Sequence, residues 1–203
     1  MNRKTLLTGL AALSIVLVTG AVATTGFRHD TAVQETMKAG AFNPPHQAPD
    51  FSLRGSGGTD VSLSRYRGKT VLLAFGFTNC AAVCPTTLAT LAQTRSALGK
   101  AANSVQVIFV TVDPERDSAA HLREYLAAFD PTFVGATGSA EDLEAVRKEY
   151  GVTAVKEGTG DDYAVAHTSS IFLIDRVGKL RAMMPFGHDP SDFVHDINLL
   201  SRT

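Results

Sequence analysis

The two cysteines of this chain, Cys80 and Cys84, lie four residues apart in the segment FTNCAAVCP. No other cysteine occurs in the sequence, so within one molecule each thiol has only the other as a partner. Such a pair can form a structural disulfide, act as a redox couple or hold a metal ion. The C-x-x-x-C spacing is one residue longer than the C-x-x-C redox motif, and by itself it leaves all three roles open.

Helical spacing favours a metal ion over a disulfide. The Cβ atoms of residues i and i+4 on a helix lie about 5–6 Å apart, whereas a disulfide needs about 3.5–4.5 Å. A bond between Cys80 and Cys84 would therefore require a distorted first turn. A metal ion fits more easily, because two metal–sulfur bonds of about 2.3 Å let the sulfurs stand about 4 Å apart.

The cysteine pair follows a predicted strand and enters a predicted helix. Residues 71–77 are continuously apolar, which is typical of a strand buried on both faces. Leu88, Leu91 and Leu98 then mark one face of a helix. Sites in open α/β sheets collect beyond the carboxyl ends of strands. The positive end of the helix also stabilises a thiolate by roughly 0.3–2 kcal/mol, which lowers the pKa of a thiol.

The rest of the chain alternates between strands and helices. Ser139 with Asp142 forms a capping box for a helix that ends at Gly151. The other predicted elements are a hairpin of residues 51–53 and 61–63, strands at 105–112, 171–174 and 180–184, a helix at 118–129 and a last helix that starts at Asp189-Pro190. This order predicts an α/β fold in which helices flank a central sheet.

Two thiolates rarely complete a metal site, so we searched the six histidines for a third ligand. His29 and His46 precede the predicted domain, His121 and His195 fall within predicted helices, and His188 lies in the loop before the last helix. His167 differs, because it stands just before the strand at 171–174, which can return beside the first strand. On position alone its role is open between a solvated loop residue and a ligand. Two cysteines and one histidine suit Cu(I), Cu(II) or zinc.

Four other residues are candidates for secondary roles. The segment DPERD, which begins at Asp113, closes the second buried strand. Asp117 or the next residue is expected to cap the following helix, whereas Asp113 is open between a turn and a role in tuning or docking. Met183 and Met184 are soft donors, but neighbouring strand residues face opposite sides, so we expect one in the core and one at the surface.

The N-terminal residues predict export. Arg3 and Lys4 precede an uncharged run over residues 5–27. As a helix this run would span about 35 Å, enough to cross a hydrocarbon core of about 30 Å. Its basic flank favours a cytoplasmic N-terminus and an exported remainder. A cleaved signal peptide ending near the Ala-Val-Ala at 21–23 is equally compatible.

The chain after the apolar run divides into a tether and one domain. Residues 28–47 contain Pro44 and Pro45 and lack hydrophobic periodicity, so we interpret them as a tether. Residues 48–203 have the length of one domain. The formal net charge of the chain is −1, which gives no basic excess for nucleic-acid binding. Outside the cytoplasm disulfides persist, so the two thiols are bonded, metal-loaded or kept reduced by a thiol reductant.

Five motifs in this order make the chain similar to a known family. They are PDFSL, GKTVLLAFGFTNCAAVCP, VTVDPERD, YGV and AHTSSIFLID. Together they resemble the Sco/SenC proteins, which are thioredoxin-like, membrane-tethered copper chaperones for cytochrome c oxidase. The resemblance covers the chain from about residue 48 to the C-terminus.

The resemblance implies a thioredoxin-like sheet and a copper site made by Cys80, Cys84 and His167. It implies delivery of copper to the dinuclear site of cytochrome c oxidase subunit II, or reduction of that site's cysteines. The location that follows is the periplasmic face of the inner membrane, or the periplasm if residues 1–27 are cleaved. The family often has histidine at the position of Asn79 and aspartate at that of Ala166, and neither departure removes a ligand.

Two enzymatic functions are alternatives to a metallochaperone. In an exported thiol–disulfide oxidoreductase, Cys80 would attack a partner disulfide and Cys84 would resolve the mixed disulfide. A peroxiredoxin-like peroxidase is less compatible, because the segment LLAFGF before the cysteines lacks the proline that such a site requires.

Overall fold

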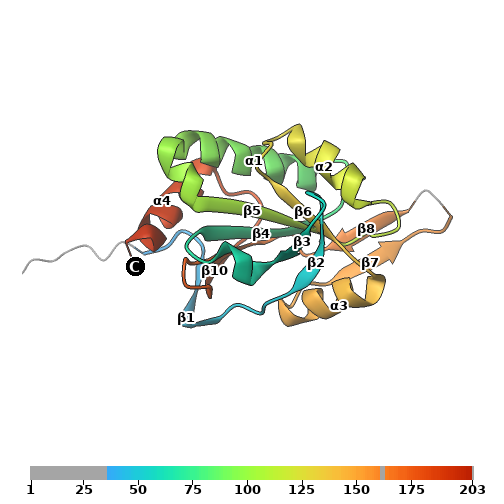
Figure 1. Ribbon diagram of the computed structural model, residues 1–203, viewed down its shortest axis with the longest axis horizontal. Helices are drawn as coiled ribbons and strands as arrows, with labels where there is room; N and C mark the ends of the chain where they lie inside the picture. The colour runs from blue at the N-terminus through green and yellow to red at the C-terminus, as the bar shows by residue number, and fades with distance from the viewer. Residues whose placement is uncertain (1–35, 161–162, 203) are drawn as a thin grey trace, which may run out of the picture. The chain divides into compact units, whose positions relative to one another are not determined.

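The computed structural model describes residues 36–160 and 163–202 of the chain. These residues form four α-helices and ten strands (Figure 1). The helices are α1 (Val83–Leu98), α2 (Ala119–Ala127), α3 (Ala140–Glu149) and α4 (Pro190–Ser201). The strands are β1 (Gly40–Gln47), β2 (Ser52–Gly55), β3 (Asp60–Ser62), β4 (Thr70–Gly76), β5 (Val105–Thr111), β6 (Val134–Thr137), β7 (Ala154–Glu157), β8 (Ala164–His167), β9 (Ile171–Ile174) and β10 (Lys179–Met184).

One mixed sheet organises the molecule. It has eight strands in the order β1-β10-β9-β4-β5-β6-β2-β3, and β7 and β8 form a separate two-stranded sheet. The central strands β4, β5 and β6 are parallel, whereas β9 is antiparallel to β4. Every residue of β4 and β5 is buried, as their continuous apolar sequences predict. The predicted α/β class with a thioredoxin-like central sheet is confirmed.

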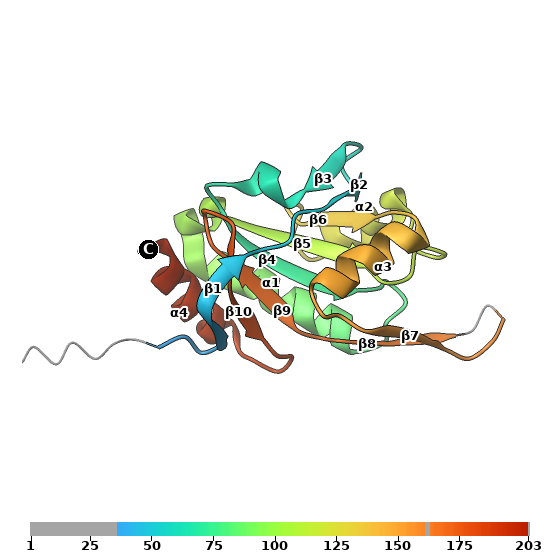
Figure 2. The same cartoon turned by 90° about the horizontal axis from the view of Figure 1, so that it is seen from below.

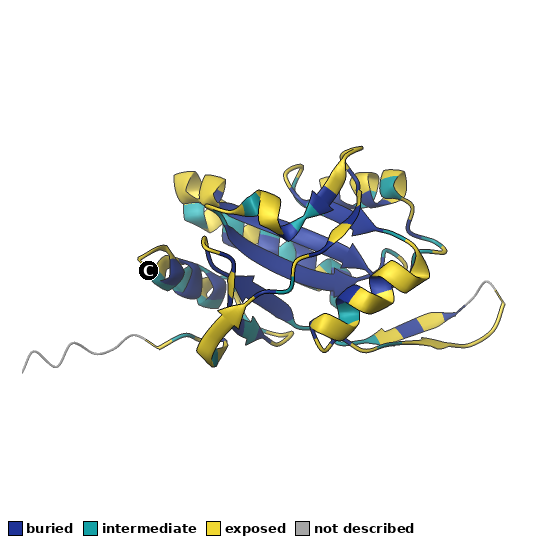
Figure 3. Ribbon diagram, turned by 60° about the horizontal axis from the view of Figure 1, so that its bottom comes forward, coloured by how far each residue is buried: buried dark blue, intermediate teal, exposed yellow. Residues whose placement is uncertain are grey.

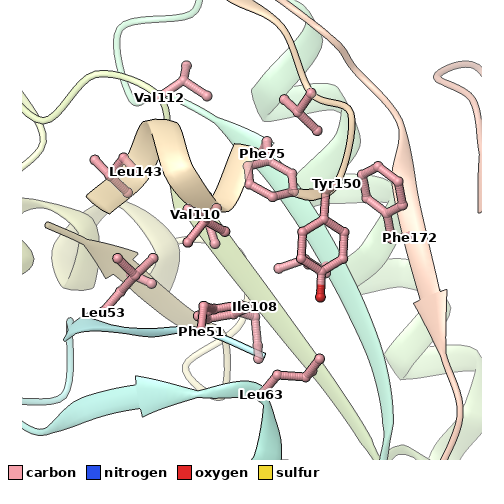
Figure 4. Close-up of a cluster of buried hydrophobic side chains, with 14 of the residues drawn as sticks. Phe51, Leu53, Leu63, Phe75, Ile108, Val110, Val112, Leu143, Tyr150 and Phe172 are labelled. Atoms are coloured by element: carbon pink, nitrogen blue, oxygen red, sulfur yellow. The ribbon is translucent and has the colours of Figure 1, made fainter. Parts of the chain in front are cut away.

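Helices cover both faces of the main sheet, and each face has its own apolar core (Figures 1 and 3). Helices α1, α2 and α4 pack on one face through leucines such as Leu88 and Leu122. Helix α3 packs on the other face, where Leu53 and Val61 from the β2–β3 edge of the sheet join the same core. There the rings of Phe75, Tyr150 and Phe172 meet in a cluster, with centroids 5.3–6.0 Å apart (Figure 4).

The turn and helix-cap signals in the sequence predict the places of the hairpin and of helix α3 correctly. The β2–β3 hairpin forms as predicted, with Ser52 opposite Ser62. The Ser139 hydroxyl accepts a hydrogen bond from the Asp142 amide at 3.0 Å, so the predicted cap of α3 is confirmed. Gly151 follows the end of α3 with a positive φ of 66°, which a glycine adopts without strain.

The interpretation of residues 28–47 as a tether is wrong for its last part. Residues 40–47 form β1, an edge strand that pairs antiparallel with β10. Its side chains are mostly exposed, so it carries no apolar alternation. Pro44 and Pro45 lie where the register shifts between Ala41 and His46. Proline is tolerated at such an edge because no ladder hydrogen bond is required from it.

The predicted membrane anchor or signal segment, residues 1–27, lies outside the described residues. Among the helices that the structure describes, none has the length and apolar character needed to cross a bilayer.

A buried carboxylate attaches the start of β1 to the last helix. Asp196 of α4 is fully buried and accepts hydrogen bonds from the backbone amides of Lys38, at 2.7 Å, and Ala39, at 2.8 Å. Without this side chain both amides would lose their acceptor, and the amide of Ala39 would be left unpaired in the interior. The contact thus fixes where the chain enters the domain, beside α4.

We expect Asp196→Ala to lower the free energy of unfolding by about 1–3 kcal/mol, because it removes the acceptor of two backbone amides, one of which, that of Ala39, is buried. Urea denaturation of the purified chain measures this change. The matched control is Asp192→Ala on the same helix, where the carboxylate is 30% exposed and bonds to His188, and where we expect less than about 1 kcal/mol. Equal losses in the two variants would contradict the role given to Asp196.

Candidate metal centre

The two cysteines occupy the junction between β4 and α1. Cys80 is partly exposed in the loop after β4, whereas Cys84 lies in the first turn of α1 and is 2% exposed. The N-cap residue of α1 is Ala82, whose side chain cannot accept a hydrogen bond. The Cys84 amide donates instead to the Cys80 sulfur at 3.4 Å. The sulfur of Cys80 therefore acts as the cap of α1, at its positive end.

His167 reaches the same point from a distant part of the chain. It is the last residue of β8, and its Nε2 atom lies 3.6 Å from the Cys84 sulfur. Its Nδ1 atom donates to the Thr168 carbonyl at 2.9 Å, which leaves the Nε2 lone pair facing the thiols. The ring of Phe77 packs edge-on against the imidazole. Ligand atoms of Cys80, Cys84 and His167 all lie within 4.8 Å of one another.

The two thiols have different acidities. Burial alone raises the pKa of Cys80, but the backbone amides of Cys84, Ala82 and Val83 stabilise its thiolate and hold its pKa below the ordinary value. Burial raises the pKa of Cys84 to about 12, and the neighbouring Cys80 contributes in the same direction. At neutral pH, Cys84 thus keeps its proton until a cation replaces it, because metal binding requires the thiolate.

Gly76, the last residue of β4, gives Cys84 room to be buried. A Cβ atom added at Gly76 would lie 2.8 Å from the Cys84 sulfur and 2.7 Å from the ring of Phe109. Real Cβ atoms do not approach other atoms this closely, so only glycine fits. The sequence motifs do not indicate a role for this glycine, although a glycine at the end of a strand, directly before the cysteine loop, is a usable signal.

Asp117 anchors the loop that carries Cys80. Its fully buried carboxylate accepts bonds from the Thr78 hydroxyl at 2.6 Å, the Thr78 amide at 3.1 Å and the Thr111 hydroxyl at 2.6 Å. His121 approaches Thr78 from the exposed side, with Nε2 3.0 Å from its hydroxyl. Of the two residues expected to cap α2, Ser118 and not Asp117 is the cap. Asp117 instead ties the cysteine loop to the end of β5.

None of the other candidates joins the three ligand atoms within the described part of the chain. Asp113 is buried and bonds to Arg116 and Tyr163, so it has a structural contact there. Met184 is buried and Met183 half-buried, as the alternation predicts. The remaining histidines contact other groups: His46 meets Phe42, His188 bonds to Asp192, and His195 bonds to Asp196. His29 lies outside the described residues.

The donor set suits a soft or borderline cation. Two sulfurs and an imidazole nitrogen converge, and such ligands are preferred by copper and zinc. A cavity of about 610 Å³ opens beside them, lined by the cysteine loop and β8, with Cys80 and His167 among its walls. A ligand atom from another molecule can therefore approach Cys80, whereas Cys84 is buried.

We expect Cys80 to react with iodoacetamide much faster than Cys84 in the reduced chain at pH 7–8. The lowered pKa of Cys80 gives it more thiolate at this pH, and Cys84 with its pKa of about 12 remains protonated and buried. Peptide mass spectrometry after timed labelling measures the order. Preferential labelling of Cys84 would contradict the arrangement described above.

We expect Gly76→Ala to destabilise the fold and displace Cys84, because the new methyl group meets Phe109 and the sulfur. Overpacking of this kind costs about 1–3 kcal/mol. Gly57→Ala is the matched control, since a Cβ there has no atom within 4 Å. Thermal denaturation and Cys84 labelling of both variants test the prediction, and an unchanged Gly76→Ala chain would refute it.

Comparisons with known proteins agree with this geometry. The SCO1/SenC family model matches residues 40–201. The Saccharomyces cerevisiae protein SCO1 is 31% identical over 83% of this chain and 60% of its own length. A SCO2-like protein of Rickettsia felis is 34% identical over 64% of this chain and 65% of its own length. The chain thus spans less than two thirds of these relatives.

Solved structures give the same assignment. Copper-bound ScoI of Bradyrhizobium japonicum has a TM-score of 0.71 and 35% identity, covering 76% of this chain and 99% of that one. Apo Sco1 of Thermus thermophilus has a TM-score of 0.72 and 36% identity, covering 82% and 98%. The family model covers most of the chain, and solved Sco structures share its fold, so the chain belongs to the SCO1/SenC family.

Proposed function

We propose that this chain is a copper chaperone that binds one copper ion through Cys80, Cys84 and His167. The observation that carries the proposal is the convergence of these three ligand atoms within 4.8 Å of one another. Copper-bound structures of similar proteins from Bradyrhizobium japonicum and yeast support the choice of metal. A role in cytochrome c oxidase assembly is supported by a 27% identical structure that is described as a Sco-family assembly protein.

The site is suited to carry and release a soft cation. Two thiolates and Cu(I) have a net charge of −1, which the N-terminus of α1 partly offsets. His167 supplies a neutral third ligand, so it adds no charge. The more exposed sulfur, Cys80, lies in the wall of the open cavity. Copper would leave by exchange of ligands at Cys80 first, while Cys84 and His167 still hold it.

The proposed recipient is subunit II of cytochrome c oxidase, with its dinuclear copper site. In an oxidising compartment a thiol reductant must keep both cysteines reduced. The proposed location is the periplasmic face of the inner membrane, with residues 1–27 as the anchor, or the periplasm if they are cleaved. The described chain enters the domain beside α4, at the opposite end from the β7–β8 hairpin (Figures 1 and 2). Attachment there leaves the metal centre accessible.

An exported thiol–disulfide oxidoreductase would use the same cysteines. The low pKa of Cys80 and the raised pKa of Cys84 suit an attacking and a resolving thiol. That chemistry needs no imidazole beside the buried sulfur, however, and His167 lies 3.6 Å from Cys84. The contact favours the chaperone, and His167 is the residue that separates the two functions.

We expect the reduced chain to bind one Cu(I), and alanine at Cys80, Cys84 or His167 to weaken binding by at least about 10-fold to 100-fold. Competition with a chromophoric Cu(I) chelator measures the affinity. His188→Ala, at a histidine bonded to Asp192, is the control and should bind like the native chain. His167→Ala should retain thiol–disulfide exchange. Full copper affinity in His167→Ala would exclude the proposed ligand set.

A further inference from the structure

The β7–β8 hairpin, which carries His167, stands apart from the main sheet. Its two strands pair only with each other among the described strands, and it projects beyond the end of the sheet (Figure 2). Most of its side chains are exposed, and Val155 is 60% exposed (Figure 3). An isolated two-stranded hairpin is only marginally stable in water. Contacts outside the hairpin must therefore hold His167 against the thiols.

Tyr163, directly before β8, makes the densest set of such contacts. It is 7% exposed, and its hydroxyl donates to an Asp113 carboxylate oxygen at 2.6 Å. Two cations lie against its ring: Arg116 Cζ and Lys156 Nζ are each 3.7 Å from the ring centroid. Arg116 also donates to the Tyr163 carbonyl at 3.0 Å. Both the side chain and the backbone of Tyr163 are thus fixed.

The hydrogen-bond partners of Tyr163 belong to the loop between β5 and α2. Asp113 and Arg116 lie in this loop and form an ion pair with each other. Lys156 belongs to β7 and pairs with Glu115 of the same loop at 2.9 Å, which adds a second link. Tyr163 and Lys156 therefore attach both strands of the hairpin to one loop.

The same loop is attached to the cysteines. The Asp113 amide donates to the Thr111 hydroxyl at 2.9 Å, and that hydroxyl donates to Asp117 at 2.6 Å. Asp117 in turn holds Thr78, two residues before Cys80. A continuous series of hydrogen bonds thus connects Tyr163 to the cysteine loop. None of the three metal ligands takes part in this series.

We propose that Tyr163 is the positioning residue of the metal centre, which sets the placement of His167 by fixing the β7–β8 hairpin to the loop that also anchors the cysteines. The inference rests on the proposed function, since it concerns the third copper ligand. With Tyr163 bound to Asp113, His167 is held in contact with Cys84. When that bond is lost, the hairpin is less firmly held and His167 leaves its contact with Cys84. Only the two sulfurs then remain to bind the metal.

The test compares two tyrosine hydroxyls in the reduced full-length chain. Tyr163→Phe removes only the hydroxyl and keeps the ring between its cations. Tyr150→Phe is the matched control, because Tyr150 is also buried and its hydroxyl donates to the Pro49 carbonyl at 2.7 Å, which belongs neither to the hairpin nor to the loop between β5 and α2. Tyr163→Leu, which removes the ring as well, gives the larger perturbation.

Two measurements are made on each variant. In the metal-free chain, hydrogen exchange of the β8 amides should become at least about tenfold faster in Tyr163→Phe and unchanged in Tyr150→Phe. Copper affinity should fall by about tenfold or more in Tyr163→Phe, and further in Tyr163→Leu. In a His167→Ala background, Tyr163→Phe should have no further effect on copper affinity, because the ligand that it positions is absent.

The outcomes separate the inference from the proposed function. Equal behaviour of Tyr163→Phe and Tyr150→Phe would overturn the inference, as would an affinity loss of the same size with and without His167, which would indicate general destabilisation. A native chain that binds no copper would overturn the proposed function. The exchange measurement on the metal-free chain would still decide whether Tyr163 fixes the hairpin.

Discussion

The contact between the His167 imidazole and the Cys84 sulfur is the constraint on which the metal centre depends. It joins residues 83 positions apart, at a distance of 3.6 Å. One side of it lies in the core, because Cys84 is buried beside Gly76 at the end of the central strand. The other side belongs to a hairpin outside the main sheet. The geometry of the site is therefore decided by how firmly this hairpin is held.

The asymmetry of the two sulfurs follows from their places in the fold. Cys80 caps α1 and lies beside the open cavity, so backbone amides stabilise its thiolate and another molecule can reach it. Cys84 faces the core and keeps its proton unless a cation compensates the charge. In a chaperone this arrangement gives an exchangeable ligand and a retained ligand. The same difference between an accessible thiolate and a buried thiol would suit an attacking and a resolving cysteine if the histidine were absent.

The sequence predicts the parts of the structure that depend on local pattern. The buried strands before Cys80 and Asp113, the cap at Ser139 and the paired strands near the C-terminus all carry strong signals, and they are present. Strand β1 falls within the predicted tether because its side chains are exposed and two of them are prolines, so only its pairing with β10 identifies it as a strand. The sequence does not predict the β7–β8 hairpin because its strands are short and mostly exposed, although Tyr163 and Val165 alternate with small residues before His167. The convergence on Cys84 depends on tertiary contacts of that hairpin, which no local pattern contains.

X-ray absorption spectroscopy at the copper edge tests the ligand set most directly, on the reduced chain loaded with one equivalent of Cu(I). We expect a three-coordinate ion with two sulfur scatterers and one nitrogen scatterer that shows the outer-shell signature of imidazole. The imidazole signature should disappear in His167→Ala. A two-coordinate, sulfur-only spectrum that is the same in the native chain and in His167→Ala would contradict the account.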